Sequence, residues 1–229
     1  MNKMSWIVGM ALVAAVACSD SKESGTVGTS GATSATDNPA PTGATITDGD
    51  RSFVNDLAIA NMAEVDLGKL ATEHSSNPDV KKFGQMMIDD HTEAGHKIET
   101  VASAHNIAVP TAIDEKHREL HDKLAGLRGS AFDQEYASAM ADGHEDVLSK
   151  LESRIDGAVL ADWKAKFGDA LRSKSAETRQ PPPVTPETSD NPVTMAINQW
   201  AAEAYPTVFK HTESAKTLED AVKRTQRSQ

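Results

Sequence analysis

Hydrophobic side chains recur along most of this 229-residue chain at alternating steps of three and four residues, the period of an α-helix with one buried face. Alternation with a period of two is scarce, and Ala, Leu, Met, Lys, Glu and Asp dominate, so the sequence predicts an all-α fold. Four long stretches carry the helical pattern, at residues 48–74, 77–106, 130–155 and 191–222.

The hydrophobic seam of the four long stretches repeats at a mean of about 3.5 residues, which predicts near-antiparallel helices in an up-down four-helix bundle. We expect successive long helices to alternate in direction. A shorter amphipathic stretch at residues 113–127 predicts a short extra helix between the second and third. Residues 157–190 form an insertion between the third and fourth, with a short helix followed by a proline-rich extended part.

Each long stretch places one metal-binding side chain where its seam requires a hydrophobe. These side chains are Glu64, His91, His144 and His211. At about 1.5 Å of rise per residue, all four fall within about one turn of a common level. A buried unpaired carboxylate costs on the order of several kcal/mol, and an unsatisfied imidazole costs roughly 1–3 kcal/mol. We therefore expect the four side chains either to share an ion or to satisfy one another.

A shared ion would have Glu64, His91, His144 and His211 as its ligands. Three imidazoles and one carboxylate suit Fe²⁺, Zn²⁺, Mn²⁺ or Cu²⁺ better than Mg²⁺ or Ca²⁺, which prefer all-oxygen shells. The sequence does not choose among the four transition metals.

Three further side chains are candidates for the surroundings of this ion. Asp90 directly precedes His91 and is placed to orient an imidazole. Met87 and Met140 lie four residues before His91 and His144, so each shares a helix face with its histidine. Their thioethers would suit copper, although methionine is also a common filler of hydrophobic cores.

The alternative to a metal site is a hydrogen-bonded layer of Glu64 and the histidines that only fixes the register of the helices, in a structural or interaction module. An enzyme is the least favoured class, because an oxidase or peroxidase site needs open coordination positions and more carboxylates. No nucleophile elbow and no phosphate-binding glycine loop is found, so we predict no catalytic residue.

The first residues predict export. Residues 1–17 combine an early positive charge, a short apolar run and small residues, which is typical of a secretory signal peptide rather than a membrane span. Cys18 follows at once, so we expect a lipoprotein signal with Cys18 lipidated; ordinary cleavage near Ala17 is the alternative. Ser19, in a Gram-negative host, favours the periplasmic face of the outer membrane.

Composition divides the rest of the chain into a tether, a domain and a tail. Residues 18–49 are rich in Ser, Thr and Gly and predict a flexible tether. Residues 50–223 can bury one core, and residues 224–229 form a short tail. The formal net charge of −11 excludes nucleic acid as a partner. Trp163 and Phe167 of the insertion are candidates for covering one end of the bundle, or for contact with a second copy or another envelope protein.

Several local motifs resemble a ferritin-like family of unknown function from the bacterial envelope, whose members are often described as predicted outer membrane proteins. The resemblance covers about residues 51–223, and the first two helices are its most specific part. It rests on Phe53-Val54, Met62-Ala63-Glu64-Val65, Leu67-Gly68-Lys69-Leu70-Ala71, Val80 to Met87, Asp90-His91, Phe132-Asp133, Tyr136, His144-Glu145, and Tyr205-Pro206-Thr207-Val208 with His211.

This resemblance implies a ferritin-like bundle and an envelope location, and it implies no particular reaction. The chain departs from the family pattern in two places. Gly143 stands where the third helix of the family usually has Asp, which removes a carboxylate next to His144. The connection before the last helix is longer than the usual short loop by roughly thirty residues.

Overall fold

The computed structural model describes residues 45–172 and 182–227, within a unit of the chain that spans Pro41–Gln229. The predicted signal peptide, Cys18 and nearly all of the predicted tether lie outside the described residues. The described residues form six helices and no strand, which confirms the all-α prediction. The helices are α1 (Asp48–His74), α2 (Pro78–Ala104), α3 (Glu115–Ala125), α4 (Gly129–Glu152), α5 (Gly157–Arg172) and α6 (Pro192–Arg227).

Side-chain caps explain where the first two helices begin. The first is capped by Thr47 rather than by Asp48 or a later acid: the Thr47 hydroxyl accepts from the Asp50 amide while the Asp50 carboxylate bonds back to Thr47. In α2, Asn77 accepts from the backbone of the first turn and Pro78 occupies a position that needs no N–H donor. Local sequence therefore sets these boundaries before any tertiary packing.

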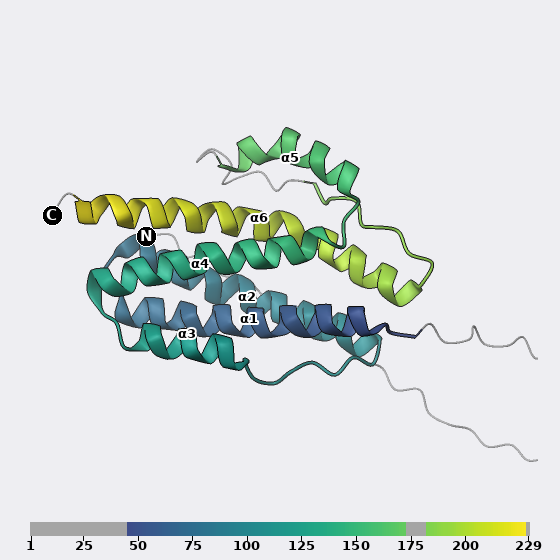
Figure 1. Ribbon diagram of the computed structural model, residues 1–229, viewed down its shortest axis with the longest axis horizontal. Coiled ribbons are helices and arrows are strands. Elements are labelled where there is room, and N and C mark those ends of the chain that lie inside the picture. Colours follow the sequence, from purple (N-terminus) through teal and green to yellow (C-terminus); the bar gives the residue numbers. More distant parts are fainter. Residues whose placement is uncertain (1–44, 173–181, 228–229) are drawn as a thin grey trace, which may run out of the picture. The chain divides into compact units, whose positions relative to one another are not determined.

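The four long helices pack as two antiparallel pairs, α1 with α2 and α4 with α6, as Figure 1 shows. The two helices of the first pair approach each other closely at Gly68 and Gly84. A Cβ atom on Gly68 would lie 2.7 Å from the backbone oxygen of Gly84, so only glycine permits this spacing. The short α3 contacts α1 and α4, and α5 contacts α6.

The prediction that successive long helices alternate in direction is wrong at the third long helix, α4. Contacts between α1 and α4 pair Asp56 with Lys150 and Asp50 with Arg154, so α4 runs antiparallel to α1. The second helix is also antiparallel to α1, which means that α2 and α4 run in the same direction (Figure 1). The physical reason is α3 with its preceding loop, which carries the chain back along the bundle before α4 begins.

Two hydrophobic clusters fill the space between the long helices. One contains Phe53, Leu57, Ile98, Leu151 and Ile197, and the other contains Leu67, Phe83, Met87, Phe132 and Leu218. Each long helix contributes one segment to the first cluster and another segment to the second. Its polar seam residue lies between these two segments. A polar layer thus separates two apolar cores.

The insertion packs on the bundle through α5. The indole of Trp163 is buried against Tyr205 and Phe209 of α6, and its Nε1–H donates to the Pro182 carbonyl. Phe167 packs beside Trp163. The insertion therefore packs along α6 through Trp163.

The last helix is longer than expected. It continues through Arg227, so residues 224–227 belong to α6 and not to a separate tail. Pro206 lies inside it, at a point where the missing N–H removes one helical hydrogen bond. None of the described helices is long and apolar enough to cross a membrane.

Candidate metal site

Three of the four polar seam residues meet in the middle of the bundle. His91 of α2, His144 of α4 and His211 of α6 each offer one ring nitrogen, and these nitrogens all lie within 4.8 Å of one another. The ring centroids are 5.6 Å apart for His91 and His144, 5.5 Å for His91 and His211, and 5.6 Å for His144 and His211. The rings form a nearly equilateral triangle.

Uncharged acceptors hold two of the rings. The Nδ1 of His91 is 3.1 Å from the Oδ1 of Asn61, and the Nδ1 of His144 is 2.8 Å from the carbonyl oxygen of Met140, one turn earlier on the same helix. Because each acceptor requires a proton on Nδ1, the Nε2 atom of each ring carries the lone pair. Both Nε2 atoms are buried and have no hydrogen-bond partner among the described residues.

The third ring is held by a charged acceptor. His211 donates its Nε2–H to Oδ2 of Asp90 at 2.9 Å, a contact that joins α6 to α2. The bond from His211 holds the pKa of Asp90 below its usual range, so the acceptor is a carboxylate. The lone pair of His211 is left on Nδ1, which is buried without a partner. Asp90 thus occupies the orienting position that its place beside His91 suggested, but on a different histidine.

Burial favours the neutral form of two rings of the site, His91 and His211. Loss of solvent lowers the pKa of His91 well below its ordinary value, and proximity to His144 and His211 lowers it further. Burial also lowers the pKa of His211, against the opposing effect of Asp90. Neutral imidazoles with free lone pairs are the form in which histidine binds metal ions.

Glu64 lies beside this triangle and not in it. Its Oε1 is 3.5 Å from the Nδ1 of His144, the nitrogen that already donates to Met140, while its Oε2 is buried without a partner. Burial raises the pKa of Glu64. A Cβ atom on Gly143 would lie 3.4 Å from the Glu64 Oε1, so the small residue at 143 leaves room for this carboxyl group.

The two methionines of the predicted surroundings lie in the hydrophobic core. The side chains of Met87 and Met140 are both buried in the cluster that contains Phe83 and Phe132. The contact that Met140 makes with the site is through its backbone carbonyl.

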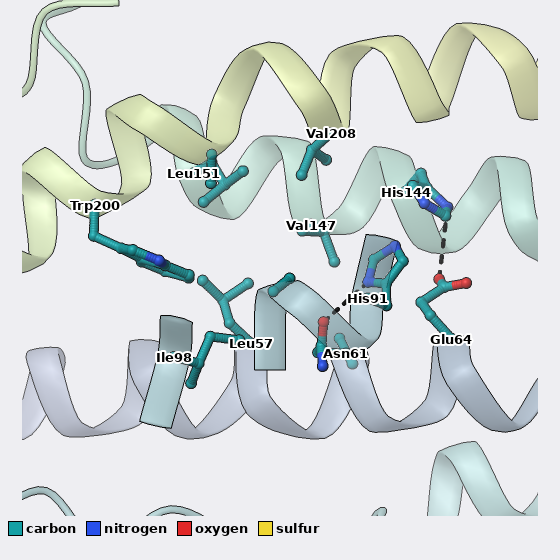
Figure 2. A pocket seen from close by; sticks show the side chains of 13 residues that line it. Leu57, Asn61, Glu64, His91, Ile98, His144, Val147, Leu151, Trp200 and Val208 are labelled. Atoms are coloured by element: carbon teal, nitrogen blue, oxygen red, sulfur yellow. Dashed lines mark hydrogen bonds and ion pairs between the residues drawn. The ribbon is translucent and has the colours of Figure 1, made fainter. Parts of the chain in front are cut away.

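A cavity of about 60 Å³ adjoins the polar layer, as Figure 2 shows. Glu64, His91 and His144 lie at one end of it and Trp200 at the other, and the wall between them is aliphatic. A second, larger hollow of about 360 Å³ is also lined by Asn61 and His91, together with exposed residues such as His96 and Glu99. Asn61 and His91 thus form a wall that the two spaces share.

The histidine triangle can accept a metal ion with small movements. Three nitrogens at about 2.0–2.1 Å from one tetrahedral ion lie roughly 3.4 Å apart, so each nitrogen needs to move inward by less than about 1 Å. The three donor nitrogens are buried, and the other nitrogen of each ring is held by a hydrogen-bond acceptor, as in histidine ligands of protein metal sites.

Sequence reasoning missed Asn61 and the role of the Met140 carbonyl. Asn61 follows Leu57 by four residues and precedes Glu64 by three, so a polar residue in phase with the seam was visible in the sequence. Its neighbour Gly95 leaves it room, because a Cβ atom there would lie 3.0 Å from Asn61 Nδ2. A backbone acceptor such as the Met140 carbonyl leaves no sequence signal.

Comparison with known proteins gives a family and nothing more specific. Residues 35–173 match the family described as "Domain of unknown function (DUF4142)". The matched part contains Glu64, His91 and His144, whereas His211 lies beyond it. No curated protein and no solved structure gives a significant match to the chain.

Proposed function

We propose that this chain, which belongs to the DUF4142 family, binds one transition-metal ion on His91, His144 and His211. The observation that carries the proposal is the set of three buried ring nitrogens without partners, each on a ring whose other nitrogen is held by an acceptor. An ion between the rings gives all three lone pairs a partner at once.

The same observation counts against a layer that only fixes helix register. In such a layer the side chains satisfy one another, yet in the described part of the chain the three inward nitrogens and Oε2 of Glu64 have no hydrogen-bond partner. Each unsatisfied buried group costs roughly 1–3 kcal/mol. Buried histidines that do not pair with one another are better explained as ligands.

The donor set narrows the choice of metal. Imidazole suits zinc, copper and iron, whereas manganese prefers carboxylate and carbonyl oxygens. The thioethers of Met87 and Met140 lie in the core, which weakens the argument for a copper site with sulfur ligands. We propose zinc, iron or copper bound by nitrogen alone, with Asp90 orienting His211.

We further propose that the bundle is ferritin-like. Ferritin-like folds contain one long crossover among four helices, and here residues 105–128 return along the bundle so that α2 and α4 run in the same direction. The donor set differs from the carboxylate-rich di-iron sites of that class, because its three donors are imidazoles. The carboxyl groups of Glu64 and Asp90 lie next to the outer nitrogens of His144 and His211.

The biological role that we propose is buffering of a metal ion, or protection against metal stress, at the cell envelope. We propose that an ion enters from the hollow of about 360 Å³, because His91 contributes both to its lining and to the histidine triangle. The envelope location rests on the signal-like residues 1–17 and on Cys18 as the point of lipid attachment. We propose no catalytic reaction.

Metal content tests the proposal. The purified protein is incubated with micromolar zinc, iron or copper, desalted and analysed for bound metal. We expect one equivalent in the wild type and in the control His96→Ala, whose ring is exposed, and none in His211→Ala. Absence of metal from the wild type contradicts the proposal. An effect of His211→Ala on stability alone supports the register alternative.

Lipid attachment is tested separately. We expect the wild-type protein to be found in the membrane fraction of its host, and Cys18→Ser to be found in the soluble fraction. Membrane association of the Cys18→Ser protein equal to that of the wild type contradicts this part of the proposal.

A further inference from the structure

The cavity next to the histidines differs from the site itself in chemistry. Polar side chains gather at one end, where Asn61, Glu64, His91 and His144 contribute to the wall, and the indole of Trp200 lies at the other end. The rest of the wall is apolar and comes from all four long helices, including Leu57, Ile98, Val147, Leu151 and Val208. Figure 2 shows these side chains between Trp200 and the histidines.

We infer that this cavity binds a small apolar molecule of the size of dioxygen, in contact with the inner face of the histidine site. The inference concerns the cavity itself, and only its link to a metal ion rests on the proposed function.

Size restricts the occupant. The cavity measures about 60 Å³. A single water needs roughly 10–15 Å³ of such space, and an apolar cavity of about 150 Å³ accepts benzene. The occupant is therefore larger than one water molecule and smaller than an aromatic ring. Diatomic gases and xenon fall in this range.

Polarity restricts the occupant further. A buried water needs two to four polar partners, and an aliphatic wall supplies none along most of its length. A charged ligand would lose its hydration without compensation. An apolar molecule loses no hydrogen bonds in this position, so the wall selects against water, peroxide and anions.

The position of the cavity places its occupant next to the histidine site. His91 and His144 contribute both to the cavity wall and to the histidine triangle. Three protein ligands leave at least one coordination position of a transition-metal ion free. A molecule in the cavity lies next to the ligands of the ion, with the Glu64 carboxyl group beside it.

Methyl NMR on the full-length protein tests the inference with two probes, xenon and dioxygen, first without metal and then with diamagnetic zinc. Under xenon pressure we expect saturable shifts of the methyl signals of Leu57, Val147 and Leu151. Under dioxygen pressure we expect paramagnetic relaxation of the same methyl groups to exceed that of the exposed Val159.

Two variants fill the cavity from opposite sides, Ala204→Leu on α6 and Ala60→Leu on α1, and Ala131→Leu on the exposed face of α4 is the matched control. We expect xenon affinity to fall at least about tenfold in either filled variant that remains folded and to stay unchanged in the control. Wild-type methyl groups that do not respond to either gas overturn the inference.

The two proposals fail in different experiments. Gas binding without metal uptake would contradict the proposed metal site and support the proposed gas-binding cavity. Metal uptake without a response to either gas would contradict the gas-binding cavity and support the metal site.

Discussion

The Nε2 atom of His211 lies 2.9 Å from Oδ2 of Asp90, and this contact joins the last long helix to the second across the bundle. The carboxylate fixes the proton of the imidazole on the outer nitrogen, which turns the lone pair of Nδ1 toward His91 and His144. One surface carboxylate therefore determines whether a core histidine can act as a ligand.

Loss of that carboxylate is predicted to weaken metal binding. In Asp90→Asn the amide can accept from His211 but carries no charge, so we expect the dissociation constant for zinc to rise by about 10–100-fold. Competition with a chromogenic chelator measures this dissociation constant. The control is Asp89→Asn, one residue away, where the carboxylate is exposed and bonds to Gln85. Equal effects of the two substitutions would show that only the surface charge matters.

The close approach of α1 and α2 predicts a destabilising glycine substitution. Gly68→Ala places a methyl group 2.7 Å from the backbone oxygen of Gly84, which cannot move as a side-chain end can. We expect a loss of about 1–3 kcal/mol in the free energy of unfolding, despite the better helix propensity of alanine. A Cβ atom on Gly157 would have none of its described neighbours within 4 Å, so Gly157→Ala should change the free energy of unfolding by less than about 1 kcal/mol. Urea unfolding measures both, and equal stabilities would refute the tight packing.

Two buried tyrosines are predicted to respond in opposite ways to loss of their hydroxyl groups. The hydroxyl of Tyr136 is buried without a partner, whereas Tyr205 donates to Glu152 at 2.9 Å. We expect Tyr136→Phe to leave the free energy of unfolding unchanged or to raise it by about 1 kcal/mol, and Tyr205→Phe to lower it by about 1 kcal/mol. Thermal unfolding of the two variants in parallel decides this, and a loss of stability in Tyr136→Phe would mean that its hydroxyl has a partner.

Asp50 is predicted to make the protein sensitive to acid. Burial by itself raises the pKa of Asp50, but hydrogen bonds from Thr194, Thr47 and Arg154 outweigh it and hold the pKa below its usual range. A carboxyl group whose pKa is lower in the folded state contributes stability above its unfolded pKa of about 3.9, and this stability is lost as the pH falls through the folded pKa.

We therefore expect the free energy of unfolding of the wild type to fall between about pH 5 and pH 2 more steeply than that of Asp50→Asn. Urea unfolding at several pH values measures the two slopes. Thr194→Val, which removes one donor and keeps Arg154, should give an intermediate slope. The same slope in the wild type and in Asp50→Asn would refute a role for this carboxylate.

The helices and the common level of the polar residues were predictable from local sequence. The spacing of the hydrophobic residues and caps such as Asn77-Pro78 mark the helices. A polar residue near the middle of a long helix lies at about the same level of the bundle whether the helix runs up or down. For that reason the reversed direction of α4 leaves His144 in the layer.

Two features were not predictable from the sequence: the direction of α4, and which of the four polar side chains belong to the histidine site. Direction depends on how far α3 and its loop carry the chain, which no periodicity encodes. Glu64 shares the level of the histidines, but the rotation of α1 about its own axis turns the carboxyl group toward the side of His144 that faces Met140. Rotation is set by packing contacts such as Gly68 against Gly84, which act across helices.

X-ray absorption spectroscopy of the zinc-loaded protein tests the central claim most directly, because it counts the imidazoles bound to the ion. We predict three imidazole nitrogens at about 2.0–2.1 Å from zinc in the wild type, and two in His91→Ala prepared at a zinc concentration that still loads the site. A shell of oxygens alone, or a spectrum that His91→Ala leaves unchanged, would contradict a metal site built on His91, His144 and His211.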